Sequence, residues 1–169
     1  LSTYFSALPH SSYHMTVFNV WSEGQPQPHV SKEFMENKET INWPKVLNNI
    51  GTLCMNLQLN ELKTKITTRN DRRDYTTLGI DIQVDKETQD CLAELRNNIS
   101  KFVGHGDNDL KFHMTLAYRY KNVPESERVA VNAEIRNLNK HIEEVSRSNI
   151  TFNKPFASWF KDMLEFHRK

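Results

Sequence analysis

Three stretches of the chain place apolar residues at the spacing of a helix that is buried along one side. The first begins near Trp43-Pro44, where a proline suits the first turn. The second covers residues 86–103 and ends at the polar, glycine-containing loop 104–109, and the third opens at Pro124 and Ser126 and runs to about Arg147. We expect these three helices to bury Val46, Leu47, Ile50, Leu53 and Cys54 in the first, Leu92, Leu95, Ile99 and Phe102 in the second, and Val131, Ile135, Leu138 and Ile142 in the third.

Short runs rich in β-branched and aromatic residues predict strands between and around the helices. The polar run 69–74 is typical of a hairpin connection between two of these strands. Hairpins mixed with crossing helices favour an α+β fold over a doubly wound parallel sheet. The expected strands cover residues 13–21, 63–68, 76–84, 112–118, 150–153 and 156–166.

The length of the chain indicates one domain. A chain of 169 residues can bury one core, or two small lobes that share an interface, so we expect a single domain over residues 1–169. The chain begins at Leu1, without Met and close to the strand predicted from Tyr13. We therefore expect it to be trimmed at the N-terminus or cut from a longer protein, with a strand that pairs upstream of Tyr13 missing.

The balance of charge argues against long duplex nucleic acid as the main partner. Lysine and arginine number 22 against 21 aspartate and glutamate, a net charge of +1 at pH 7, so no broad cationic surface is expected. A phosphodiester end needs only local charge, which Arg69, Arg72 and Arg73 could supply. The simpler interpretation of these arginines, a solvated hairpin turn, carries at least equal weight.

The cysteines and the apolar runs suggest the compartment. Cys54 and Cys91 fall within predicted helices, and two distant thiols argue for buried free cysteines instead of a disulfide scaffold. No apolar run is long enough to span a bilayer, and the first residues are polar and aromatic, unlike a secretory leader. We expect a soluble cytoplasmic protein that is a monomer and has no membrane partner.

The tripeptide His-Met-Thr occurs twice, each time behind an aromatic residue and ahead of an apolar run. The copies are His14-Met15-Thr16 and His113-Met114-Thr115. Side chains alternate between the faces of a strand, so each copy would present an imidazole and a hydroxyl on one face. A single copy would be explained by a packed histidine beside a β-favouring threonine, whereas two copies that share the middle Met, a preceding aromatic residue and a following apolar run are hard to obtain by chance.

These residues resemble the 2H phosphoesterases, a superfamily named for two His-x-Ser/Thr motifs on related strands. The segments 8–18, 112–118 and 155–166 are similar to its DUF1868-type branch, so the resemblance covers almost the whole chain. It implies a two-lobed α+β fold with antiparallel sheets flanking a central groove and helices on the outer faces. In many superfamily members an Arg follows the second motif where this chain has Tyr118, so substrate contacts of that Arg cannot be transferred.

Paired imidazoles suit phosphodiester cleavage without a metal. An imidazole titrates near pH ~6.5, so one histidine can act as neutral base while the other acts as protonated acid. We expect His14 and His113 in these roles, with the assignment open, and Thr16 and Thr115 as hydrogen-bond donors to the phosphoryl oxygens. None of the seven histidines shows the spacing of a zinc site, so no metal and no cofactor is expected.

Residues next to the second motif are candidates for substrate binding. Regular alternation places Arg119 on the face of His113, where it could meet phosphate or simply be solvated. The same alternation places Tyr118 on the opposite face, so that it stacks on a base only if the strand bulges or ends early. Other aromatic residues close to the motifs in sequence, most of them expected in the core, are Tyr13, Phe18, Trp21 and Tyr120.

Together the motifs and the resemblance predict a metal-independent phosphodiesterase. The resemblance implies an RNA end or small nucleotide as substrate, such as a 2′,3′-cyclic phosphate, a 2′-5′ linkage or a cyclic oligonucleotide. Two alternatives use the same residues: a module that binds nucleotide or RNA phosphate without turnover, and a ligase or cyclase that acts in the reverse direction.

Overall fold

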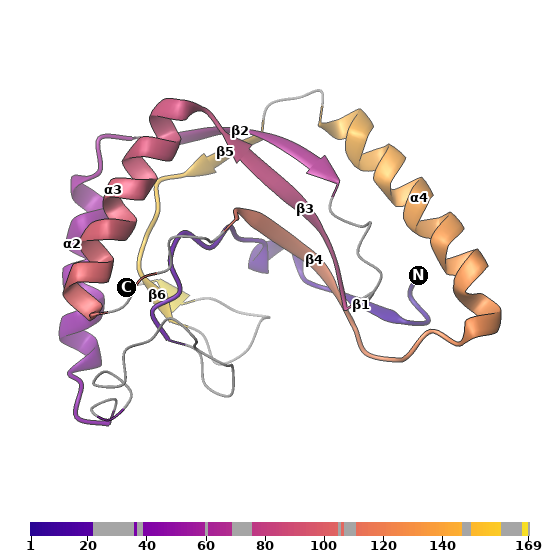
Figure 1. Ribbon diagram of the computed structural model, residues 1–169, viewed down its shortest axis with the longest axis horizontal. Helices are drawn as coiled ribbons and strands as arrows, with labels where there is room; N and C mark the ends of the chain where they lie inside the picture. Colours follow the sequence, from indigo (N-terminus) through magenta and orange to yellow (C-terminus); the bar gives the residue numbers. More distant parts are fainter. Residues whose placement is uncertain are drawn as a thin grey trace.

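A five-stranded antiparallel sheet forms the centre of the molecule, with its strands in the order β1-β4-β3-β2-β5 (Figure 1). The computed structural model describes residues 1–21, 36, 39–59, 61–68, 76–104, 106, 111–146 and 150–159, and the backbone of 167–168. A second, two-stranded antiparallel sheet pairs β6 with β7. The strands are β1 (Phe5–Ala7), β2 (Glu61–Thr68), β3 (Thr77–Val84), β4 (His113–Arg119), β5 (Ile150–Asn153), β6 (Ser158–Trp159) and β7 (His167–Arg168).

Local chemistry explains where two of the helices begin. The side chain of Asn42 accepts a hydrogen bond from the Lys45 N–H and caps α2 (Trp43–Asn56). The side chain of Asp85 accepts one from the Thr88 N–H and caps α3 (Lys86–Val103), which ends at a left-handed glycine, Gly104. The other helices within the described ranges are η1 (His10–Ser12), η2 (Glu125–Glu127) and α4 (Arg128–Val145). Helices α2 and α3 pack together at one end of the sheet and α4 lies at the other (Figure 1).

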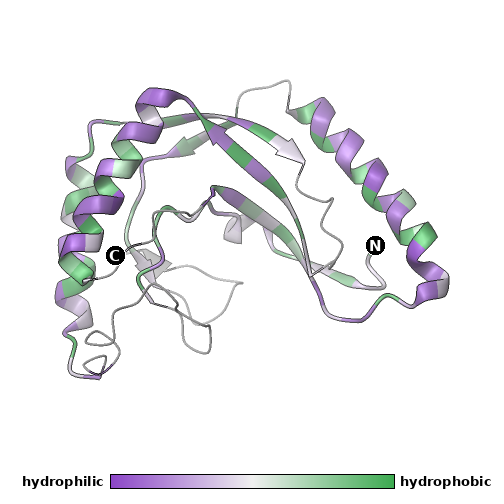
Figure 2. Cartoon of the chain, in the orientation of Figure 1, coloured by the Kyte–Doolittle hydropathy of each residue, from purple (hydrophilic) through white to green (hydrophobic). Residues whose placement is uncertain are grey.

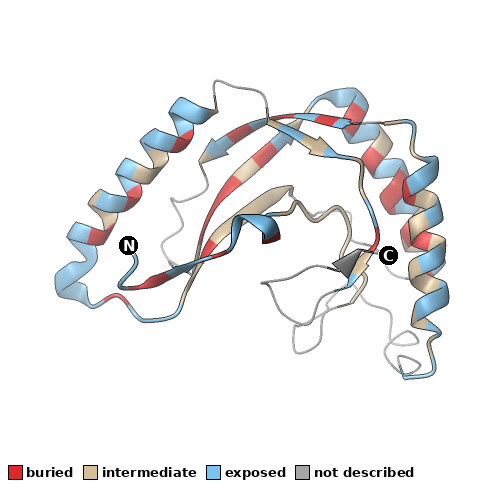
Figure 3. Cartoon of the chain, turned by 180° about the vertical axis from the view of Figure 1, so that it is seen from behind, coloured by how far each residue is buried: buried red, intermediate tan, exposed pale blue. Residues whose placement is uncertain are grey.

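Apolar side chains on one face of the sheet form the core together with the helices. Leu62 of β2 packs with residues of α2 and α3, while Ile66, Ile80 and Ile82 pack with Ile142 of α4. Apolar and polar residues alternate along the helices (Figure 2), and buried residues recur along the helices and the central strands (Figure 3). The result is an α+β fold with an antiparallel sheet, as the sequence predicts.

Several expectations about individual elements are wrong. Residues 13–21 form no strand, and β1 lies upstream of them instead. Residues 154–157 form no strand either, so the strand predicted over 156–166 is reduced to β6 within the part that the structure describes. Phe102 is exposed because Val103 takes the buried position at the end of α3, and Cys91 is only half-buried.

Other expectations hold, or lie outside the described residues. The predicted stripes of α2 and α4 contain buried Ile50, Cys54, Val131, Ile135 and Ile142. The hairpin connection 69–74 and most of the loop 104–109 lie outside the described residues. None of the helices in the described part of the chain is long and apolar enough to cross a membrane.

Candidate functional site

The second His-Met-Thr motif lies at the beginning of β4, in the middle of the sheet. Its His113 and Thr115 are half-buried and share one face, while Met114 packs in the cluster of Ile66, Ile80 and Ile82 on the other. Because the helices pack on the face of Met114, the imidazole and the hydroxyl lie on the face opposite the core. The structure confirms the prediction that this motif lies on a strand with His113 and Thr115 on one face.

A β-bulge interrupts the pairing of β3 with β4 directly after the motif. Leu78 pairs with Ala117 and Gly79 with Thr115, so that Leu116 is an extra residue on β4. A Cβ atom built on Gly79 would lie 2.6 Å from the carbonyl oxygen of Met114. Only a glycine at this position lets β4 approach β3 so closely.

The bulge exchanges the faces of the residues that follow it. Tyr118 pairs with Thr77 and Ser6, which share the face of Gly79 and therefore of His113. Arg119 pairs with Phe5, which is buried in the cluster of α4. The prediction from regular alternation is wrong for both residues: Tyr118 shares the face of His113, and Arg119 belongs to the face of the core.

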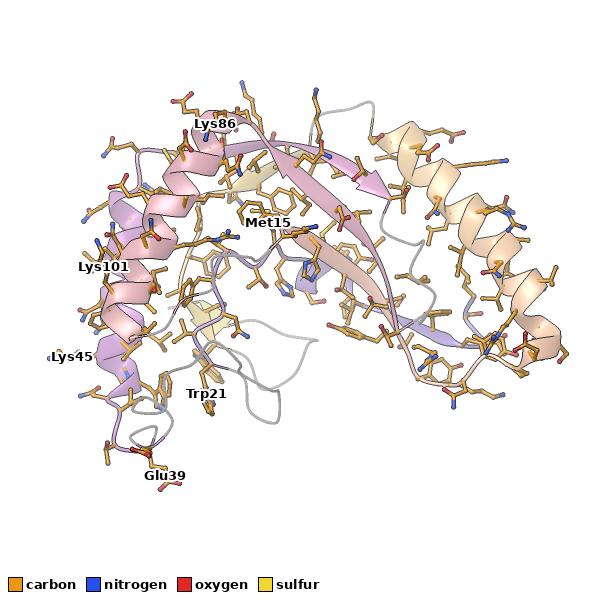
Figure 4. The ribbon with its side chains drawn as sticks, viewed as in Figure 1. Met15, Trp21, Glu39, Lys45, Lys86 and Lys101 are labelled. Atoms are coloured by element: carbon orange, nitrogen blue, oxygen red, sulfur yellow. The ribbon has the colours of Figure 1, made fainter. Side chains whose placement is uncertain are left out.

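The first motif follows η1 and lies outside the strands of the sheet. Strand β1 runs antiparallel to the second half of β4, so the chain moves toward the start of β4 as it approaches η1, and residues 13–16 follow near that start. Met15 packs against two core clusters that also contact Phe112, and Figure 4 shows it beside the beginning of β4. The two motif segments are therefore neighbours, although only one of them is a strand. His14 and Thr16 on either side of Met15 are half-buried.

Both motif histidines make the same local contact. The Nδ1 atom of His14 lies 2.7 Å from the carbonyl oxygen of Ser12, and the Nδ1 atom of His113 lies 3.0 Å from that of Lys111. A carbonyl oxygen only accepts hydrogen bonds, so each ring carries a proton on Nδ1. In the neutral form the lone pair is then on Nε2, the nitrogen that points away from the local backbone. The two rings are held in the same tautomer by equivalent partners two residues upstream.

Asp81 on β3 is a candidate that the sequence reasoning missed. It is the cross-strand partner of His113. The neighbouring Ile82 N–H donates a hydrogen bond of 2.9 Å to the carbonyl oxygen of Phe112, so Asp81 and His113 form a non-hydrogen-bonded pair. Side chains in such a pair share a face, with their Cβ atoms about 4.5–5.5 Å apart. Only the register of β3 against β4 reveals this pairing, because the two residues are distant in sequence.

The face of His113 continues as a polar surface across β3 and β2. Thr67 of β2 pairs with Asp81 of β3. Two residues further along the strands, Lys65 pairs with Gln83. Lys63 follows on the same face of β2. All four of these polar side chains are exposed: Lys63, Lys65, Thr67 and Gln83. The arrangement places an imidazole, hydroxyls, a carboxylate and two ammonium groups on one side of one sheet.

The described residues do not gather metal ligands at this site or elsewhere. No three histidine, cysteine, aspartate or glutamate side chains cluster within the part of the chain that the structure describes. A cleft of about 520 Å³ lies between α2 and α3, where Asn49, Thr52, Asn98 and Phe102 line it. Those helices pack on the face of the sheet opposite His113, so this cleft is separate from the motifs.

Comparison with known proteins supports the fold. No known family profile matches the chain. The chain is 27% identical over 171 residues to the uncharacterised protein 127L of Invertebrate iridescent virus 6, covering 89% of this chain and 69% of the viral protein. The structure is similar to that of a conserved protein of unknown function from Agrobacterium tumefaciens, with a TM-score of 0.61 and 16% identity. That similarity covers 99% of this chain and 71% of the bacterial one, and it shows a shared fold.

Proposed function

We propose that this protein is a metal-independent phosphodiesterase of the 2H type, with a two-lobed 2H phosphoesterase-like arrangement. The observation that carries the proposal is the duplicated motif itself: two His-Met-Thr segments lie next to each other in the fold. Their histidines are held in the same tautomer by the same local contact. A duplicated sequence with a duplicated side-chain geometry is difficult to explain by packing alone.

The proposed mechanism uses one histidine as base and the other as acid. The base takes a proton from water or from a ribose hydroxyl through Nε2, and the acid protonates the leaving oxygen. Thr16 and Thr115 donate hydrogen bonds to the non-bridging oxygens and hold the phosphorus atom between the rings. Tyr118 stacks on a base next to the reacting phosphate.

Asp81 supports an assignment of these roles. A carboxylate beside an imidazole stabilises the protonated ring, and Asp81 is the cross-strand partner of His113. We therefore assign the acid to His113 and the base to His14. In a pH–rate profile, Asp81→Asn should move the alkaline limb to lower pH and leave the acidic limb unchanged. Movement of the acidic limb alone would reverse the assignment.

The proposed substrate is an RNA end or a short oligonucleotide, including a 2′,3′-cyclic phosphate, a 2′-5′ linkage or a cyclic oligonucleotide. Lys63 and Lys65 support a substrate with more than one phosphate, because they lie on the face of His113 and extend away from it along β2. Cationic side chains along a polar surface bind successive phosphates of a single strand. The modest net charge fits a short substrate better than a long duplex.

A panel of three substrates tests the proposal. A 2′,3′-cyclic nucleotide, a 2′-5′ oligoadenylate and a cyclic oligonucleotide are incubated in excess EDTA with wild type, His113→Ala and the control His141→Ala, and the products are separated by chromatography. His141 is an exposed histidine of α4 whose contact is to Glu144, 3.5 Å away. We expect the wild type and the control to cleave at least one member at equal rates, and His113→Ala to cleave none.

Other outcomes of the panel separate the competing functions. Binding of a panel member without turnover would favour a module that binds nucleotide phosphate. Loss of wild-type cleavage in EDTA, with recovery on addition of zinc or magnesium, would contradict the metal-free mechanism. A ligase or cyclase would consume linear 2′- or 3′-phosphate ends instead of producing them.

A further inference from the structure

Arg96 of α3 is a charged side chain inside the core. It is 9% exposed, and its neighbours include the apolar cluster of α2 and α3. A buried guanidinium is costly unless its N–H groups find partners, so its position indicates a defined task. Figure 4 marks the two ends of α3 with Lys86 and Lys101, and Arg96 lies between them along the helix.

The side chain of Arg96 contacts both motif segments. Its Nε–H donates a hydrogen bond of 2.8 Å to the carbonyl oxygen of Val17, the residue that follows Thr16. Its Cζ atom lies 4.4 Å from the ring centroid of Phe112, the residue that precedes His113. One planar group therefore joins the end of the first motif to the beginning of the second. Along the chain, Val17 is 79 residues from Arg96 and Phe112 is 16 residues from it.

Arg96 reaches the motifs from the side opposite the histidines. Phe112 packs in the core clusters with Met15 and Met114, on the face of the sheet that the helices cover. His113 points to the other face, as the strand alternation and its pairing with Asp81 require. The guanidinium therefore lies behind the motifs, where a substrate on the face of His113 does not meet it.

We propose that Arg96 is a positioning residue that fixes the two His-Met-Thr segments relative to each other, so that both imidazoles keep the orientation needed to act on one phosphate. The effect on turnover rests on the proposed function, whereas the effect on the two rings does not. A lysine cannot replace it fully, because an ammonium lacks the planar surface that stacks on Phe112. Residues 13–16 lie outside the strands of the described part of the chain, and the hydrogen bond from Arg96 to Val17 joins the end of this segment to α3.

The test uses three variants of this arginine, Arg96→Met, Arg96→Gln and Arg96→Lys. Its readout is the protonation of the two histidine rings. Arg96→Met removes both the donor to Val17 and the guanidinium that lies over Phe112, while Arg96→Gln keeps an amide N–H at the position of Nε and removes the guanidinium. Arg136→Met is the control, an exposed arginine on α4. Long-range proton–nitrogen NMR spectra report which ring nitrogen of His14 and of His113 is protonated, and thermal unfolding confirms that each variant is folded.

We expect both rings of the wild type and of Arg136→Met to be protonated at Nδ1 when neutral. In Arg96→Met both rings should lose this preference and populate the two tautomers. In Arg96→Gln only His113 should change, because the contact to Val17 is kept. If Arg96→Met fails to fold, Arg96→Gln and Arg96→Lys supply the comparison with the control.

Activity provides a second reading where a panel substrate is cleaved. Arg96→Met should lower kcat about tenfold or more, the effect expected of a misplaced catalytic group, with KM changed much less. A folded Arg96→Met or Arg96→Gln whose histidine tautomers match the wild type would overturn the proposal, whether or not the protein is an enzyme. Altered tautomers in a protein that cleaves no substrate would support the positioning role and contradict the phosphodiesterase.

Discussion

Replacement of Gly79 by alanine tests how the sheet holds the second motif in place. Gly79 is buried opposite Thr115, at the bulge between β3 and β4. The new Cβ would lie 2.6 Å from the carbonyl oxygen of Met114 and 3.5 Å from the Cα atom of Thr115. The first distance is far inside van der Waals contact, and the atom it meets belongs to the backbone. The clash can be relieved only if β4 moves away from β3.

The cost of this movement can be estimated from other overpacked sites. Forcing an extra carbon into a packed interior lowers the free energy of unfolding by about 1–3 kcal/mol. For a chain of this size, each kcal/mol corresponds to about 2–4 °C in Tm. Urea unfolding monitored by circular dichroism should therefore show a lower midpoint with an unchanged slope. The same displacement moves His113 and Thr115, so any phosphodiesterase activity should fall along with the stability.

Gly51 provides a matched control for the same chemical change. It lies within α2, and nothing comes within 4 Å of a Cβ built on it. Alanine is favoured over glycine inside a helix by roughly 0.5–1 kcal/mol, so Gly51→Ala should raise the midpoint. The reasoning would be refuted if Gly79→Ala were as stable as the wild type, or were stabilised like Gly51→Ala.

Three further predictions follow from the described residues. Burial raises the pKa of the Cys54 thiol, whereas Cys91 is only half-buried. A thiol reagent should therefore label Cys91 before Cys54. Equal labelling rates for the two cysteines would contradict the packing of α2. Hydrogen bonds from the first turn of α3 lower the pKa of Asp85, so its contribution to stability exists above the unfolded pKa and is lost as pH falls through the folded one. Asp85→Ala should therefore destabilise the protein at pH 7 and have little effect in strong acid, as urea titrations at the two pH values would show; a loss independent of pH would argue against the charged cap. Lys63→Gln with Lys65→Gln should weaken binding of a short single strand and reduce the slope of log affinity against log salt by about 0.7 for each lost phosphate contact, and an unchanged slope would remove these lysines from the binding surface.

Local signals explain which elements the sequence predicts well. The helix expected over residues 86–103 agrees with α3, because Asp85 caps its beginning and Gly104 ends it. The expected strands at 63–68 and 76–84 agree closely with β2 and β3, and burial alternates clearly along β2. Capping, glycine and alternation are all properties of neighbouring residues, so one sequence is enough to detect them.

The remaining features depend on contacts between distant residues. The three residues of β1 become a strand only by pairing with β4, and residues 13–21 resemble a strand in sequence but find no partner among the described strands. The bulge at Leu116 exchanges the faces of Tyr118 and Arg119, and nothing in the motif predicts it. Asp81 and Arg96 join the candidate site through strand register and helix packing, which a motif search cannot detect.

The most direct test of the central claim is the rate of cleavage by the two motif histidine variants, measured in EDTA on whichever panel substrate the wild type cleaves. If the imidazoles act as an acid–base pair, His14→Ala and His113→Ala should each lower kcat by roughly 10²–10⁴-fold. His141→Ala should cleave at the wild-type rate. The wild type should show a bell-shaped pH–rate profile, and each motif variant should lose one limb of it. Full activity in either motif variant, or a flat profile in the wild type, would contradict paired-histidine catalysis.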